Sequence, residues 1–310
     1  MARPTVIFTH IQKTAGTTVG RFLKLMYACR PPSNVLRLDL TMGLHHLHND
    51  VYADFPHVRS QALQELGPSQ RARIRYIQGH MSFGLHELFD QPTTYITAVR
   101  EPVSRVLSHF AQIQNLLPAA QMPQARELTL KARKLGLREF VTRYPIDALC
   151  NFQTKMLAGV NDGLPGSLSP YDIHSGSDEL LQRALKNFDD RFHCIVTERL
   201  DESLLVLQRQ LNWPLVFYFT SNVSKRRMRE SQLKGAEIDL ITELNSLDLR
   251  LYEHALDKLD EDCRLYGSEL TKSLENLQTR NHHINRWLAA PVDRVLKSGR
   301  SLLNRRYRTR

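Results

Sequence analysis

The stretch from Thr5 to Thr18, TVIFTHIQKTAGTT, constrains the fold more than any other part of this 310-residue chain. A short apolar, β-branched run leads to a basic residue, Lys13, and then to a single glycine, Gly16, before a helical pattern begins at Thr17. This order predicts a strand, a tight turn and a helix N-terminus. Backbone N–H groups at the start of a helix and the positive end of its dipole attract phosphate or sulfate, and Lys13 adds a charge. The stretch is therefore predicted to bind a nucleotide-like donor.

Hydrophobic periodicity indicates that strands and helices alternate along much of the chain. Further strands are expected at 35–40, 73–78, 93–99, 193–198 and 215–220. Helices are expected at 17–27, 60–66, 83–89, 103–117, 124–142, 146–157, 178–188, 202–211 and 238–265, the last as one long helix or a broken pair. Loops are expected at 44–57 and 161–177. This alternation favours a largely parallel sheet with ligands at the carboxyl ends of its strands.

The charge balance favours an anionic partner, because 42 Lys and Arg residues outnumber 32 Asp and Glu residues, a net charge of +10. It does not choose among nucleic acid, an acidic glycan, a phosphate-rich cofactor and a membrane surface. The four cysteines lie far apart, which is typical of buried thiols rather than a zinc site or a disulfide framework. Without a leader peptide or a run of about 20 apolar residues, the chain is expected to be cytoplasmic, although an anchor upstream of it would leave no trace.

The opening loop lacks the Walker A spacing, GxxxxGK[ST], of nucleotide triphosphatases. Its lysine precedes its only glycine, and no later strand ends in an Asp suited to bind magnesium. A nucleotide kinase or NTPase therefore remains as an alternative without its expected motif. A second alternative is a non-catalytic basic module that binds glycan or nucleic acid, in which Lys and Arg would be interleaved with aromatic residues.

A second motif, TAVREPVSRVLSHF, places Arg100 at the end of a strand and Ser108 two turns into the following helix. A planar guanidinium and a hydroxyl together suit a terminal phosphate monoester, since arginine can bind two oxygens at once. Arg105 is either a second contact or a surface charge.

A third motif, YIQGHMSFGLHELF, places Gly79 and His80 at the carboxyl end of another strand. Sites of α/β proteins are built at such strand ends. Imidazole is also the side chain best suited to accept a hydroxyl proton near neutral pH. His80 is therefore the candidate general base.

Together these motifs resemble those of sulfotransferases that use 3′-phosphoadenosine 5′-phosphosulfate (PAPS), over about residues 5–265. HIQKTAGTT is similar to the 5′-phosphosulfate loop. The chain looks most like the bacterial branch of the carbohydrate group, the sulfotransferase family 2 type, which includes heparan sulfate 2-O-sulfotransferase. The resemblance implies an α/β, P-loop-like, three-layer fold with a central, mainly parallel sheet flanked by helices.

The resemblance also implies roles for individual residues. His80 would be the general base, Lys13 would be catalytic as well as donor-binding, and Arg100 and Ser108 would hold the 3′-phosphate. The other residues of the phosphosulfate loop would bind the donor: Thr14, Ala15, Gly16, Thr17 and Thr18. SNVSKRRM is similar to the loop that closes over the donor, with three phosphate-binding candidates: Ser224, Lys225 and Arg226. A solvated basic turn is the alternative for that loop.

The chain departs from heparan-type enzymes at Gln78, where they have the first His of a His-Gly-His step. This weakens the inference of the same acceptor sugar but not the role of His80. The segment CNFQTKMLAG is also similar to a family segment and is expected to be mainly scaffold, with Asn151 and Gln153 as candidates to line the cleft.

The implied activity is transfer of a sulfuryl group from PAPS to a carbohydrate hydroxyl, with 3′,5′-ADP as product, no metal and no nucleic-acid partner. Residues 1–266 are expected to form the sulfotransferase domain and 267–310 a basic, helical extension. That extension either makes a peripheral membrane contact or is a solvated tail. The acceptor and the oligomeric state stay open.

Overall fold

The computed structural model describes residues 4–28, 67–72, 74, 76–116, 123–144, 147–160, 177–214, 216–218 and 235–286. Its centre is a four-stranded sheet with all neighbouring strands parallel, in the order β2-β1-β3-β4. The strands are β1 (Thr5–Thr9), β2 (Tyr76–Gly79), β3 (Thr93–Val99) and β4 (Phe192–Val196). Each falls where the sequence predicts a strand, to within one or two residues at most ends, so the parallel α/β fold is confirmed.

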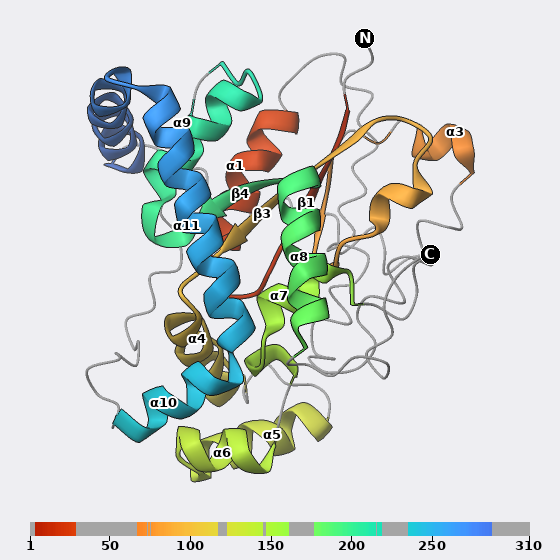
Figure 1. Ribbon diagram of the computed structural model, residues 1–310, viewed down its shortest axis with the longest axis vertical. Coiled ribbons are helices and arrows are strands. Elements are labelled where there is room, and N and C mark those ends of the chain that lie inside the picture. The colour runs from red at the N-terminus through yellow and green to blue at the C-terminus, as the bar shows by residue number, and fades with distance from the viewer. Residues whose placement is uncertain are drawn as a thin grey trace.

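Helices cover both faces of the sheet and make a three-layer, P-loop-like fold (Figure 1). The α-helices are α1 (Gly16–Ala28), α3 (Pro68–Arg71), α4 (Pro102–Asn115), α5 (Pro123–Lys134), α6 (Leu137–Arg143), α7 (Phe152–Ala158), α8 (Asp178–Arg191), α9 (Leu200–Gln210), α10 (Gly235–Leu244) and α11 (Ser246–Tyr266). Short 3-10 helices occupy Leu85–Leu88, Asp147–Leu149 and Thr197–Arg199. Helices α1 and α9 pack on one face, and α7, α8 and α11 pack on the other.

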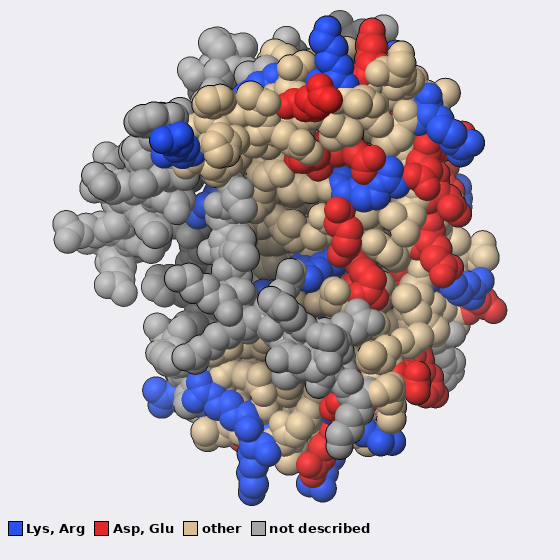
Figure 2. Space-filling view, turned by 90° about the vertical axis from the view of Figure 1, so that its left-hand side faces the viewer, with Lys and Arg blue, Asp and Glu red and all other residues tan. Residues whose placement is uncertain are grey.

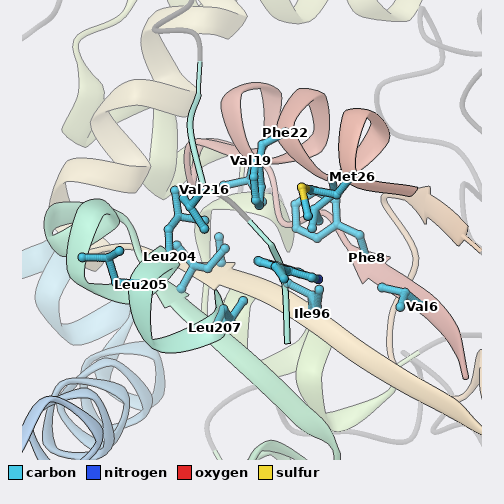
Figure 3. Close-up of a cluster of buried hydrophobic side chains, with 14 of the residues drawn as sticks. Val6, Phe8, Val19, Phe22, Met26, Ile96, Leu204, Leu205, Leu207 and Val216 are labelled. Atoms are coloured by element: carbon cyan, nitrogen blue, oxygen red, sulfur yellow. The ribbon is translucent and has the colours of Figure 1, made fainter. Parts of the chain in front are cut away.

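The central strand β1 is buried along its whole length, as expected for a parallel strand covered on both faces. Val6 and Phe8 point toward the core under α1, whereas Ile7 belongs to the cluster on the opposite face. Figure 3 shows Phe22 and Met26 of α1 meeting the β1 side chains in this core. The alternation along β1 therefore fixes α1, and with it the loop between them, against the end of the strand.

Three predicted helices differ from those observed. The segment 83–89 forms only the 3-10 turn Leu85–Leu88. The segment 124–142 is split into α5 and α6 by Gly136, which is the N-cap of α6. The segment 146–157 is divided into the 3-10 turn Asp147–Leu149 and α7, because Asn151 between them has a left-handed backbone with φ of 47°. Near the C-terminus, the broken-pair alternative is confirmed by α10 and α11.

The strand predicted at 215–220 is wrong for the described part, 216–218, which has no strand pairing. Within the described part of the chain, its backbone bonds to side chains of a helix at 269–286. Arg280 Nη1 donates to the Val216 carbonyl at 2.7 Å, and the Tyr218 amide donates to Asn281 Oδ1 at 3.0 Å. Side chains of this helix thus bond to backbone groups that would pair with another strand if the segment lay in a sheet.

The helix at 269–286 bears on the predicted C-terminal extension. Its Leu277 is fully buried in the same core as β1 and α1. The first part of the extension is therefore helical and packed, while the boundary at residue 266 stays a prediction. The predictions for 35–40, 44–57, 60–66, 161–176 and the tail beyond 286 lie outside the described residues.

A buried ion pair joins α4 to α11. Arg105 Nη2 lies 3.9 Å from Asp248 Oδ2, and both side chains are inaccessible to solvent. Arg105 Nη1 also donates to the Ala148 carbonyl at 2.9 Å, and its guanidinium lies over the Phe152 ring. The interpretation of Arg105 as a surface charge is therefore wrong, because its side chain is completely buried and paired within the fold.

Asp248 also caps α7, because its carboxylate accepts from three groups at the start of that helix. The donors are the amides of Gln153 and Thr154 and the Thr154 hydroxyl, at 3.1, 2.8 and 2.8 Å. Asn151, at the start of α7, caps α11 in the same way, because its Oδ1 accepts from the backbone amides of Leu247 and Asp248. The two helices thus cap each other through buried polar side chains.

We expect Asp248→Asn to lower the free energy of unfolding by about 3–5 kcal/mol, because it leaves the buried guanidinium of Arg105 without its counter-charge. The control is Asp178→Asn, which removes the exposed pair with Arg250 and should cost no more than about 1 kcal/mol. Urea denaturation of the three proteins measures both values. Equal losses in the two variants would contradict the role of the buried pair.

Candidate active site

The three sequence motifs meet at one edge of the sheet, because the carboxyl ends of parallel strands lie together. In the register of the sheet, Thr9 at the end of β1 pairs with Gly79 of β2 and with Thr97 of β3. The motif residues that follow these strands therefore lie at this edge: Lys13, His80 and Arg100.

The loop between β1 and α1 has an unusual backbone for a segment without glycine. Lys13 and Ala15 both have positive φ, 72° and 58°, which costs about 1 kcal/mol or more for each such residue. Left-handed residues that alternate with right-handed or extended ones turn successive N–H groups inward, the geometry of an anion-binding nest. Two contacts hold the loop in this form: Thr14 Oγ1 donates to the Ile11 carbonyl at 2.8 Å, and Arg100 Nη1 donates to the Lys13 carbonyl at 3.1 Å.

The N-terminus of α1 completes the loop. The amides of Thr18 and Val19 already donate to the Ala15 carbonyl, at 2.9 and 3.2 Å. The amides of Gly16 and Thr17 are therefore the ones that a phosphate or sulfate oxygen could use. Thr17 is exposed and Thr18 is buried, so the two predicted hydroxyls have different access to a ligand.

His10 explains why glycine is needed at position 16. A Cβ at Gly16 would lie 1.9 Å from the His10 ring, which occupies that space. The same ring stacks on Phe8 and lies against His80, with centroids 4.4 Å apart in the second case. No role is predicted for His10 from the sequence, and only the fold brings its ring between the loop and the candidate base.

The hydrogen bonding of His80 indicates which ring nitrogen can accept a proton. His80 Nδ1 lies 2.6 Å from the His10 carbonyl oxygen. A carbonyl oxygen only accepts, so Nδ1 is assigned the proton and the neutral ring has its lone pair on Nε2. This orientation is the one that a general base acting through Nε2 requires.

Gln78, where the chain departs from the His-Gly-His pattern, has a structural environment. Its Oε1 accepts from the Tyr76 hydroxyl at 2.7 Å. Its amide also lies 2.9 Å from where a Cβ of Gly20 would be, so it packs against α1. The side chain is buried between β2 and α1, which separates it from the role predicted for His80.

Arg100 is held at both its backbone and its side chain. Gln153 makes two bonds to the Arg100 backbone, and the side chain reaches the Lys13 carbonyl as described above. Arg100 Nε also lies 3.6 Å from Glu198 Oε1, and Tyr252 donates to the other oxygen of Glu198 at 3.0 Å. Lys13 and Arg100, predicted for opposite ends of a donor, are thus directly linked.

Ser108 lies two turns into α4 with a half-buried side chain. The helix begins directly after Arg100 because the Glu101 carboxylate caps it, accepting from the amides of Val103 and Ser104. The next residue, His109, was not singled out by the sequence. Burial and the charges of Arg105 and Lys13 lower the pKa of His109 to about 3, so α4 brings a neutral ring to the neighbourhood of Lys13.

Ser224, Lys225 and Arg226 lie outside the described residues. Within the ranges given above, no group of three or more His, Cys, Asp or Glu residues could hold a metal ion. Among the helices described, none is long and apolar enough to cross a membrane.

Comparison with known families supports the family resemblance of the motifs. The family model described as galactose-3-O-sulfotransferase matches residues 1–290. The chain belongs to the galactose-3-O-sulfotransferase family. The match covers the strand ends, the loop and the helix at 269–286 alike.

Individual galactose-3-O-sulfotransferases and related enzymes share between 25% and 28% sequence identity with the chain. Galactose-3-O-sulfotransferase 3 of Bos taurus is 28% identical over 260 residues, and that of Homo sapiens is 27% identical over 260 residues. Heparan-sulfate 6-O-sulfotransferase 1 of Gallus gallus is 25% identical over 290 residues. Each alignment covers 81% of this chain, but only 55%, 55% and 64% of the respective relative.

The chain thus spans little more than half the length of the bovine and human galactose-3-O-sulfotransferase 3. The carbohydrate-sulfotransferase resemblance is confirmed at the level of the family. These relatives are animal galactose-3-O- and heparan-sulfate 6-O-sulfotransferases, so the bacterial branch and the link to the 2-O-sulfotransferase stay predictions.

We expect Gly16→Ala to disrupt the loop, because the added methyl group collides with the His10 ring. The control is Gly136→Ala, where a Cβ meets nothing within 4 Å. The variant should lose affinity for a phosphate-containing ligand such as 3′,5′-ADP by about 10-fold or more, as expected when charge-assisted contacts are misplaced. Calorimetric titration measures this, and unchanged affinity in Gly16→Ala would contradict the close contact.

Proposed function

We propose that this protein transfers the sulfuryl group of PAPS to a hydroxyl of a carbohydrate. The observation that carries the proposal is the position of His80, at the end of β2 against His10 of the loop between β1 and α1, with Nδ1 bonded to the His10 carbonyl. Membership of the galactose-3-O-sulfotransferase family supports the same reaction. The nucleotide kinase and the non-catalytic basic module have no comparable support.

The donor would lie across the ends of β1 and β3. Lys13 and the residues from Thr14 to Thr18 would hold the 5′-phosphosulfate, and Arg100 and Ser108 would hold the 3′-phosphate. The remaining donor contacts are proposed for the loop that contains Ser224, Lys225 and Arg226. Support for a two-ended site comes from the bond between Arg100 and the Lys13 carbonyl, which ties the two groups of residues together.

The reaction would be an in-line displacement at sulfur. His80 Nε2 takes the proton of the acceptor hydroxyl as its oxygen forms the new bond to sulfur. The bond between sulfur and the bridging phosphate oxygen breaks, and 3′,5′-ADP leaves with that electron pair. The Lys13 ammonium and the loop amides neutralise the charge that develops on the leaving oxygen.

Magnesium is not needed in this proposal. The sulfuryl group carries less charge than the terminal phosphoryl group of ATP, so the Lys13 ammonium and the nest of backbone amides can supply the neutralisation that magnesium gives in phosphoryl transfer. Activity should accordingly persist in the presence of a chelator.

The acceptor class follows from the names of the relatives, which refer to galactose 3-O and heparan-sulfate 6-O positions. We propose a galactose-containing glycan, because the family model carries that name. Sulfate incorporation from radiolabelled PAPS should therefore be greater with galactose-terminated oligosaccharides than with heparan chains. Incorporation into heparan alone would replace galactose by heparan as the proposed acceptor, and incorporation into neither would contradict the proposed acceptor class.

We expect His80→Asn to lower kcat by about 10²- to 10⁴-fold, the usual contribution of a positioned base. Asparagine keeps a donor for the His10 carbonyl but cannot take the acceptor proton. The control is His193→Asn, which changes a histidine at the far end of β4 that bonds to Gln210. Steady-state kinetics with PAPS measures the effect, and near-parental kcat in His80→Asn would exclude this residue as the base.

A further inference from the structure

The backbone at the end of β3 is held by a side chain. At Arg100, immediately after the last paired residue of β3, the amide donates to Gln153 Oε1 at 2.8 Å. In return, Gln153 Nε2 donates to the Arg100 carbonyl at 2.9 Å. The carboxamide thus bonds to Arg100 as another peptide group would, and Gln153 is completely buried.

Gln153 is itself fixed from behind. The backbone N–H of Gln153, in the first turn of α7, donates to Asp248 Oδ2 at 3.1 Å. Asn151, two residues earlier, adopts the left-handed conformation that starts this turn, and its side chain caps α11. A continuous set of buried hydrogen bonds therefore runs from α11 through α7 to the backbone of Arg100.

The side chain of Arg100 depends on the direction in which that backbone presents it. It reaches the Lys13 carbonyl at 3.1 Å and the Glu198 carboxylate at 3.6 Å. A change in the backbone at Arg100 would move the guanidinium relative to both groups. Bidentate contacts of arginine with phosphate require such fixed geometry.

We infer that Gln153 is a positioning residue for recognition of the donor 3′-phosphate, acting through Arg100. The inference rests on the proposed function, which assigns the 3′-phosphate to Arg100. Gln153 does not touch the donor in this account. Its carboxamide sets the selectivity for donors with a 3′-phosphate over those without one.

Two substitutions separate this role from a general effect on stability. Gln153→Glu keeps the acceptor for the Arg100 amide but places a second acceptor against the Arg100 carbonyl, and Gln153→Leu removes both bonds. The matched control is Asn187→Leu. Asn187 lies in α8, and the substitution removes a bond from its Nδ2 to the carbonyl of Leu157, which is in α7 like Gln153. Asn187 has no contact with Arg100 among the interactions of the described residues.

The readout is the ratio of the dissociation constants for 5′-AMP and 3′,5′-ADP, measured by calorimetry on the full chain. The parent should prefer 3′,5′-ADP. Both Gln153 variants should lose about 10-fold or more of that preference, because affinity falls more for 3′,5′-ADP than for 5′-AMP, whose phosphate meets only the loop that Arg100 also supports. Asn187→Leu should keep the parental ratio.

Each other outcome has a distinct meaning. A parent that binds the two nucleotides equally would contradict the proposed function itself. A parent that prefers 3′,5′-ADP, with folded Gln153 variants that keep the preference or lose affinity for both nucleotides alike, would overturn only the positioning role. Failure of both variants to fold would assign Gln153 to stability and also overturn it.

Discussion

The candidate active site depends on a buried carboxylate that never reaches it. Asp248 neutralises Arg105 of α4 and caps α7, and α7 in turn supplies Gln153 to the end of β3. From there, Arg100 extends to the carbonyl of Lys13 and supports the strained loop after β1. An uncompensated charge at the start of this series would cost more than the surface ion pairs of the chain contribute. The geometry of the loop therefore depends on how α4, α7 and α11 pack together.

The charge of the protein is organised rather than spread evenly. The formal net charge is +10, yet Figure 2 shows acidic side chains gathered along one side of a face, and α11 alone exposes Glu253, Asp257, Asp260 and Glu261. The cations that matter for the proposed function, Lys13 and Arg100, lie at strand ends instead. Such local placement suits recognition of a small anion, whereas binding of a long polyanion would call for a broad basic surface.

The sequence predicted what depends on local pattern. Alternation along β1 and the runs at β3 and β4 indicated the strands, and parallel pairing then implied that Lys13, His80 and Arg100 share an edge. Contacts between distant segments were beyond such reasoning. Nothing local to Asp248 indicates that it caps α7, and nothing local to His10 shows that its ring requires glycine at position 16. The prediction of a strand at 216–218 was wrong for the same reason, because side chains of a later helix bond to the Val216 carbonyl and the Tyr218 amide.

The central claim is that the loop after β1 and the end of β3 form one site for a donor with phosphate groups at both ends. Calorimetric titration of the full chain with 3′,5′-ADP and, separately, with ATP and magnesium tests this most directly. We predict that 3′,5′-ADP binds at least about 10-fold more tightly than ATP, with or without a chelator. Tighter binding of ATP with magnesium would contradict it and would return the loop to the nucleotide kinases and NTPases.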